Sequence, residues 1–399
     1  MSVINKKMTS SLLTPDFNSY PSRKVENLTV HLLGLEVTYD DNQKTFHLSS
    51  DLRIHAVDDE TTHQITREPL ISPLDIPDDL SIKDAKIIND GTVSVTWSHP
   101  VTVNDSCVSI FQTSWLYQTG LYGGIHHEND LENETWEAKE FNNIISIDGN
   151  DYLGNNESFK KMLQTIIKFG VVVIKGLPVK ESMLEEVVSK IGTIRSSNFG
   201  KIFDVKFKND PDSNAYTGEE LLVHNDLSTR EYVPGLQFLY CIENETNGGL
   251  STLTDAFAVA KYIKKKNIGI YNLLSEYPMS FANKSASSDY RIDLPIFNHD
   301  NKGKLSEVRW TCWLRSPLRG ELSYMKKVHD AQKYFYKLAN ESRFKVEFKL
   351  NPGDMMCMDN RRILHGRTSF LGNSGSRWLR GCYMERDELW SAYRVSERS

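Results

Sequence analysis

The strongest constraint on this chain is a short His-x-Asp motif, formed by His224 and Asp226 after the apolar residues 221–223. On a β-strand, residues i and i+2 point to the same face, so this imidazole and this carboxylate would reach one metal ion together. A second histidine from a distant strand, His365, would complete a face of three ligands. The fold must therefore bring together strands that lie far apart in the sequence.

His365 follows a turn at residues 351–354 (Asn-Pro-Gly-Asp) and a strand expected at residues 355–358. Two histidines and one carboxylate, with the other metal positions open, form the ligand set of non-haem Fe(II) oxygenases. A His-x-Asp motif alone is weak support, because many proteins contain one by chance and most histidines are structural or exposed. The interpretation depends on what accompanies the motif.

Arg377 is the second feature, twelve residues after His365. If the chain turns back at residues 372–375, Arg377 enters the next strand and its guanidinium points into the same interior. Arginine pairs with carboxylates through two parallel hydrogen bonds. A keto-dicarboxylate could then bind the metal with one end and Arg377 with the other. The alternative for Arg377 is a surface ion pair.

The pattern along the chain predicts an α+β protein in two parts. Residues 1–23 read as a flexible tail, and alternating strands separated by turns predict a small β-rich N-terminal domain over residues 24–103. Residues 104–150 read as a connector with a short helix near residues 108–117. In residues 151–399, helices precede many short strands, which favours a β-barrel or jelly roll flanked by helices.

Composition excludes several classes of protein. The chain has 399 residues, 39% of them hydrophobic, and a formal net charge of −6, which favours a large core and argues against nucleic-acid binding. No apolar run is long enough to span a membrane, and the N-terminus lacks the apolar core of a secretory signal. The five cysteines are widely spaced without a CxxC motif, so reduced thiols and a cytoplasmic location are expected.

Several motifs together resemble the gamma-butyrobetaine and trimethyllysine dioxygenases of the broader taurine-dioxygenase group. The resemblance runs from about residue 25 to the end of the chain. It is carried by residues 214–217, 224–226, 234–237, 248–251, 351–354, 364–367 and 377–383. It implies a double-stranded β-helix (jelly-roll) core and Fe(II) held by His224, Asp226 and His365. It also implies that the cosubstrate 2-oxoglutarate is held by Arg377 and Ser251.

The chain departs from this family in its N-terminal domain. Family members commonly carry a zinc site there, built from three cysteines and one histidine. This sequence has no cysteine before Cys107, so no structural zinc is expected. The small domain must then be stabilised by its own core or by docking on a partner subunit.

A second departure concerns the substrate pocket. The family holds a trimethylammonium group in an aromatic cage by cation–π attraction. The matching positions are Phe199, Phe203, Tyr216 and Tyr383. Asparagines that hold the substrate carboxylate in the family are replaced here by Trp313 with Leu314, and by Ser213. Arg309 or Arg315 could supply the lost carboxylate contact, or could be exposed strand residues.

These features predict an Fe(II)- and 2-oxoglutarate-dependent dioxygenase that hydroxylates or otherwise oxidises a C–H bond of a small amine or quaternary ammonium metabolite. Gamma-butyrobetaine is not necessarily that metabolite, and Trp313 is expected in the substrate pocket with the aromatic residues. Desaturation or cyclisation would use the same residues. A cupin-like metal protein that is not an oxygenase would explain the metal ligands but not the spacing of Arg377. A silent binding protein would be expected to have lost a ligand. The family also suggests a homodimer.

Overall fold

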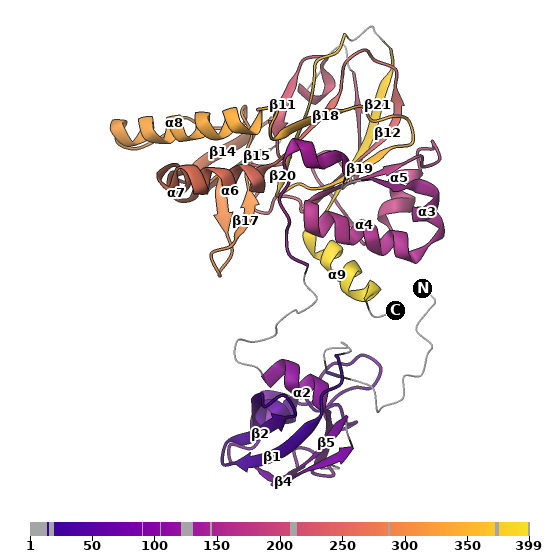
Figure 1. The fold of residues 1–399 in the computed structure, drawn as a ribbon, viewed down its shortest axis with the longest axis vertical. Helices are drawn as coiled ribbons and strands as arrows, with labels where there is room; N and C mark the ends of the chain where they lie inside the picture. Colours follow the sequence, from indigo (N-terminus) through magenta and orange to yellow (C-terminus); the bar gives the residue numbers. More distant parts are fainter. Residues whose placement is uncertain are drawn as a thin grey trace. The chain divides into compact units, whose positions relative to one another are not determined.

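The computed structural model describes most of the chain as two compact units, Met1–Asp130 and Leu131–Glu397, drawn in Figure 1. The described residues are 14–15, 20–89, 91–103, 105–120, 131–143, 146–207, 214–285, 288–371 and 375–397. Both units contain helices and sheets, so the predicted α+β class is confirmed. No helix within these ranges is long and apolar enough to cross a membrane.

The first unit contains two antiparallel three-stranded sheets. One consists of β1 (Val25–His31), β2 (Gly34–Tyr39) and β3 (Lys44–Leu48), and the other of β4 (Ile82–Asn89), β5 (Thr92–Trp97) and β6 (Val108–Gln112). Two helices, α1 (Ser49–Ile54) and α2 (Thr113–Gly120), and the 3-10 turn η2 (Pro73–Asp75) complete it. Alternate strand residues such as Val37 and Val95 are fully buried, which is why the period-2 pattern was visible in the sequence.

This unit continues beyond residue 103, where the sequence suggested that the small domain ends. The helix expected near residues 108–117 is wrong in its first half. Ser109 and Phe111 point inward, and β6 pairs with β5 from Thr92 opposite Gln112 to Thr96 opposite Val108. Sheet pairing therefore overrides the short-range pattern, and the helix α2 begins only at Thr113.

A buried ion cluster lies inside the first unit. The Arg53 side chain, at the end of α1, is fully buried and its Nη2 lies 2.8 Å from Asp105 Oδ2. Its Nη1 lies 3.8 Å from Asp58 Oδ2, and its guanidinium carbon lies 5.8 Å from the centre of the Trp97 ring. A buried charge of this kind requires such partners, so the cluster ties α1 to the loops that carry the two carboxylates.

The second unit contains a larger and a smaller sheet. The larger one is ordered β10 (Ile202–Lys206), β21 (Arg377–Met384), β12 (Leu236–Asn244), β19 (Met355–Asp359), β8 (Val171–Lys175) and β7 (Ser146–Asp148), with β9 (Ile194–Arg195) paired to β21. The smaller one is ordered β11 (Leu221–His224), β20 (Ile363–Arg367), β13 (Ser251–Asp255) and β18 (Lys345–Phe348). All pairs are antiparallel except β7 with β8.

Helices cover one face of the larger sheet, where α4 packs against β8 and β19, and α9 packs against α4 (Figure 1). These helices are α3 (Gly149–Gly154), α4 (Asn156–Phe169), α5 (Met183–Val188) and α9 (Arg386–Ser396). Helix α4 begins at the N-cap Asn155, whose side chain accepts from Ser158 N, and ends at Gly170 in the left-handed region (φ 77°). Its apolar face, including Leu163 and Ile166, joins the core below the sheet.

An insertion between β13 and β18 forms its own apolar cluster around Phe281, Phe297, Trp310 and Phe335. It contains α6 (Ala256–Lys266), α7 (Ile268–Glu276), β14 (Met279–Lys284), β15 (Asp289–Leu294), β16 (Phe297–His299), β17 (Leu305–Val308) and α8 (Leu322–Ala339). The remaining short elements are the 3-10 turns η3 (Ala138–Asn143) and η4 (Asn214–Tyr216).

The second unit begins earlier than residue 151, the start that the sequence suggested. Trp136 is buried, its backbone N–H donates to Asp255 Oδ2 at 3.1 Å, and its indole N–H donates to the Phe169 carbonyl at 2.8 Å. The end of the predicted connector is therefore part of this unit.

Candidate metal centre and its cavity

Pairing of β11 with β20 places His224 directly opposite His365. Asp226 follows in the loop after β11, and its Oδ1 lies 3.2 Å from His224 Nε2 and 3.8 Å from His365 Nε2. One candidate ligand atom from each of the three residues lies within 4.8 Å of the others. Among the described residues this is the group of histidines and carboxylates arranged to hold a metal ion.

The protonation states of this group suit a divalent cation. Burial, with the neighbouring His224, lowers the pKa of His365 to about 4, so its imidazole is neutral at pH 7, as a metal ligand must be. Burial acts to raise the pKa of Asp226, but His365, His224 and a hydrogen bond from Tyr383 hold it below its usual range. His224 Nδ1 lies 2.9 Å from the Leu222 carbonyl, so an N–H there leaves Nε2 with its lone pair facing Asp226. Two histidines and one carboxylate therefore fit Fe(II).

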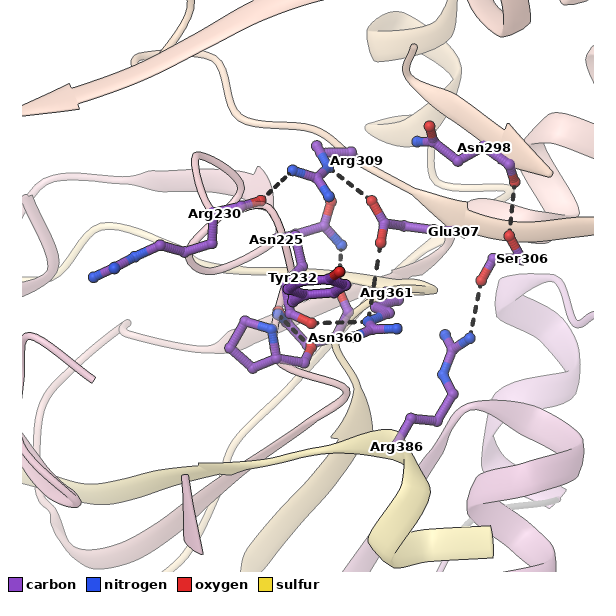
Figure 2. Close-up of polar contacts among 12 residues, drawn as sticks. Asn225, Arg230, Tyr232, Asn298, Ser306, Glu307, Arg309, Asn360, Arg361 and Arg386 are labelled. Atoms are coloured by element: carbon purple, nitrogen blue, oxygen red, sulfur yellow. Dashed lines mark hydrogen bonds and ion pairs between the residues drawn. The ribbon is translucent and has the colours of Figure 1, made fainter. Parts of the chain in front are cut away.

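Two asparagines fix the backbone that carries Asp226. Asn360 accepts from Asp226 N at 2.9 Å and donates to the Asp226 carbonyl at 3.0 Å. Asn225 donates to the Asn360 carbonyl at 2.6 Å and accepts from Trp310 N at 2.8 Å, and Figure 2 shows the first of these contacts. Neither asparagine was predicted as a site residue, because their partners lie far away in the sequence and no local motif indicates these contacts.

A buried charge network supports the loop after Asp226 (Figure 2). Arg309 donates to the Ser228 carbonyl at 3.0 Å and pairs with Glu307 at 2.7 Å, and Glu307 also faces Arg361 at 3.9 Å. Arg309 was predicted either to supply the lost carboxylate contact or to be exposed, but it is buried and its guanidinium is bound to Glu307 and to backbone carbonyls. Arg315 is also outside the cavity, because it donates to Gln332 at 3.0 Å and lies over the Trp310 ring.

A cavity of about 480 Å³ lies between the two sheets and contains the three candidate ligands. The ten residues predicted to contact the metal, the cosubstrate or the substrate all line it: Phe199, Phe203, Tyr216, His224, Asp226, Ser251, Trp313, His365, Arg377 and Tyr383. Ser213, named as a replaced asparagine, lies outside the described residues. The sequence therefore located the cavity, although its backbone supports were not foreseen.

One wall of the cavity is aromatic. The Phe203 and Tyr383 rings are stacked, with centroids 5.0 Å apart, and Phe199 lies beyond Phe203 at 6.2 Å. Gly381 makes this stack possible, since a Cβ there would lie 2.6 Å from the Phe203 ring. Trp313 packs against His224, with its ring centroid 4.7 Å from that of the imidazole.

The other end of the cavity is positively charged. Arg377 is buried beside Gly249, and no ion pair joins it to a carboxylate of the described chain. Burial lowers the pKa of Arg377 to about 10, so it stays charged at pH 7. Ser251 lies on β13 opposite Arg367 on β20, and Arg367 Nη2 donates to the Thr217 carbonyl at 2.7 Å. A carboxylate from a bound molecule would balance this buried charge.

Several known proteins are similar to this chain. The family model described as taurine catabolism dioxygenase TauD, TfdA family matches residues 131–383. A gamma-butyrobetaine dioxygenase of Pseudomonas sp. (strain AK-1) is 33% identical over 368 residues, which cover 92% of this chain and 94% of that protein. A trimethyllysine dioxygenase of Meyerozyma guilliermondii is 27% identical over 351 residues, which cover 83% of this chain and 86% of that protein. Among solved structures, this chain is similar to a putative alpha-ketoglutarate-dependent taurine dioxygenase from Burkholderia xenovorans. The two are 14% identical with a TM-score of 0.48, and the match covers 60% of this chain and 88% of that one.

Proposed function

Because the chain belongs to the TauD/TfdA dioxygenase family, we propose that it binds Fe(II) through His224, Asp226 and His365, and 2-oxoglutarate through Arg377 and Ser251. The protein is a 2-oxoglutarate-dependent dioxygenase. The predicted alternative of a cupin-like protein that is not an oxygenase is thereby set aside. The observation that carries the residue assignment is that one cavity contains the three-ligand cluster and a buried arginine that has no ion pair within the described ranges.

The larger and smaller sheets form the double-stranded β-helix of this proposal. Their facing surfaces line the cavity from both sides, with Gln237 and Leu379 from the larger sheet and His365 and Ser251 from the smaller one. A cytoplasmic location and a homodimer remain predictions from the sequence.

The substrate in this proposal is a small amine or quaternary ammonium metabolite. The curated relatives are named for gamma-butyrobetaine and trimethyllysine, and the wall of Phe199, Phe203, Tyr216 and Tyr383 offers ring faces to a cation. Trp313 lines the cavity together with Leu314, where the resemblance leads one to expect polar residues. These two apolar side chains do not reproduce the carboxylate contact of the family, so gamma-butyrobetaine need not be the substrate.

Each part of the cavity has a task in the reaction. Iron and 2-oxoglutarate, when bound, would activate dioxygen, which oxidises both the keto acid (to succinate and carbon dioxide) and the substrate C–H bond. His224, Asp226 and His365 present their ligand atoms from one side, because the β11–β20 pairing and the Asp226 loop fix all three. Arg377 orients the far carboxylate of the cosubstrate, and the aromatic wall holds the substrate cation so that one carbon faces the centre. Hydroxylation, desaturation and cyclisation all fit this arrangement.

The test is succinate formation by the purified protein with Fe(II), 2-oxoglutarate and oxygen, in the presence of gamma-butyrobetaine, trimethyllysine or related amines. We expect amine-dependent succinate release from the wild type and none from His365→Ala. His329→Ala, which changes an exposed histidine on α8, is the matched control and should keep full activity. Full activity of His365→Ala would overturn the metal assignment. Tight 2-oxoglutarate binding without turnover of any amine would overturn the substrate class.

A further inference from the structure

The two carboxylate oxygens of Asp226 have different surroundings. Oδ1 faces the histidines, at 3.2 Å from His224 Nε2 and 3.8 Å from His365 Nε2. Oδ2 points the other way and accepts two hydrogen bonds, from Gln237 Nε2 at 2.7 Å and from the Tyr383 hydroxyl at 2.6 Å. A free carboxylate can bind a metal through either oxygen or through both, so these donors restrict the choice.

We propose that Gln237 and Tyr383 form a carboxylate clamp that leaves only Oδ1 of Asp226 for the metal. The proposal rests on the proposed function, since it takes the three-ligand cluster as the iron site. Both members of the clamp are positioning residues, because they act through Asp226. By holding Oδ2 they keep a metal position open that two-oxygen binding by Asp226 would fill.

The sheet places the clamp. Gln237 on β12 and Tyr383 on β21 are direct cross-strand partners, so their side chains emerge next to each other on the cavity face. Both residues are almost fully buried, at 1% and 2% exposure. Their donors are therefore held by the central strands of the larger sheet, and they are preorganised for a ligand that comes from the smaller sheet.

The amide oxygen of Gln237 indicates that the hydrogen bond from its Nε2 to Asp226 serves the site and not only the stability of the fold. Gln237 Oε1 is buried and has no hydrogen-bond partner in the part of the chain that the structure describes. An ionised carboxylate only accepts hydrogen bonds, so the amide must turn its NH2 group toward Asp226, which leaves its oxygen without a partner among the described residues. An apolar residue in this place would avoid the cost of that buried oxygen.

Tyr383 joins the clamp to the substrate wall. Its ring stacks on Phe203 and lines the cavity, while its hydroxyl is bonded to the metal ligand. Because an ionised carboxylate only accepts hydrogen bonds, the Tyr383 hydroxyl is the donor in this 2.6 Å contact. A cation bound against the Tyr383 ring is thus one residue away from a metal ligand.

The test compares Tyr383→Phe, Gln237→Met and Gln237→Glu with Tyr240→Phe. Tyr240 is a buried tyrosine on the same strand as Gln237, and its hydroxyl donates to the Pro178 carbonyl, away from the cavity. Tyr240→Phe therefore controls for the loss of a buried hydroxyl. The probe is Co(II), whose affinity is measured by calorimetry and whose visible absorption reports the number of ligand atoms. Thermal denaturation of the metal-free proteins identifies any variant that does not fold.

Tyr383→Phe and Gln237→Met should each bind Co(II) about 10- to 100-fold more weakly, with an altered spectrum, and Gln237→Glu should lose more because it repels Asp226. Tyr240→Phe should match the wild type. Wild-type affinity and spectrum in folded Tyr383→Phe and Gln237→Met would overturn the clamp. A wild type that binds no Co(II) would instead overturn the proposed function, so the two failures are distinct.

A second comparison separates the clamp from the wall. Phe203→Leu removes a ring of the wall but no donor to Asp226, so it should raise the KM for the substrate and leave Co(II) affinity unchanged. Tyr383→Phe keeps the ring but removes a donor, so it should weaken the Co(II) affinity and leave the KM for the substrate nearly unchanged. A weaker Co(II) affinity in Phe203→Leu, equal to that of Tyr383→Phe, would count against the assignment.

Discussion

His224 and His365 lie directly opposite each other across two antiparallel strands, with ring centroids 4.5 Å apart. The same strand β20 pairs on its other edge with β13, where Leu253 faces His365. The position of the second histidine is therefore set by sheet register on both sides. A slip of one residue would turn His365 away from the cavity, so the ligand geometry is a property of the whole sheet.

Arg377→Met should raise the KM for 2-oxoglutarate by about 10- to 100-fold, because charge-assisted hydrogen bonds contribute about 1.5–3 kcal/mol. Arg377→Lys should recover part of this loss, since it keeps the charge but not the paired donors. Arg380→Met is the matched control on the same strand, where Arg380 pairs with the exposed Glu181 at 2.8 Å. Steady-state kinetics at varied 2-oxoglutarate measure the effect, and an equal rise in both methionine variants would refute the role of Arg377.

Gly381→Ala should disrupt the aromatic wall. The added methyl would lie 2.6 Å from the Phe203 ring, so the ring must leave its stack on Tyr383. We expect a several-fold higher KM for the amine substrate and a loss of about 1–3 kcal/mol of stability. Gly154→Ala, at the end of α3 with open space around it, should change neither quantity. Denaturant unfolding and kinetics measure both effects, and a wild-type KM in Gly381→Ala would show that the stack is not needed.

Arg53→Met should strongly destabilise the first unit. It leaves Asp105 buried without its charge partner, and breaking a buried pair in this way costs about 3–5 kcal/mol. Lys44→Met, which breaks an exposed pair with Glu36, should cost at most about 1 kcal/mol. Hydrogen exchange of strands β4 to β6 reports the opening of this unit in the full chain. Equal protection in the two variants would contradict the expectation.

The first unit should also lose stability in mild acid. Burial lowers the pKa of His47 to about 4, so between pH 4 and 6.5 the unfolded chain binds a proton that the folded chain does not. The contribution, on the order of 3 kcal/mol, is complete above about pH 6.5 and is lost as the pH falls toward 4. His47→Gln should flatten the dependence of unfolding free energy on pH over this range. An unchanged slope would show that other groups cause it.

The residues with a chemical role in the candidate site were easier to predict from the sequence than the residues that position them. His224, Asp226, His365 and Arg377, which line one cavity, could be predicted because metal and carboxylate binding restrict residue type and spacing within short motifs. Asn360 could not be found in this way, since its value lies in hydrogen bonds to a loop that only the tertiary fold brings near.

The errors have physical causes of the same kind. Strand β6 was expected to be helical because its alternation is short, and only its partner β5 decides the matter. Arg309 was read as a substrate contact or an exposed residue, yet it is buried on backbone carbonyls and on Glu307. A buried arginine and an exposed one look alike in a single sequence.

The place of β21 in the larger sheet also determines when the site can form in the cell. This strand lies between β10 and β12, which both precede it by many residues. Synthesis proceeds from the N-terminus, so β10 and β12 each lack β21 as a hydrogen-bonding partner until residues 377–384 leave the ribosomal exit tunnel. Arg377 and Tyr383 arrive with that final strand. A nascent chain that ends before residue 377 therefore lacks two of the residues that line the cavity.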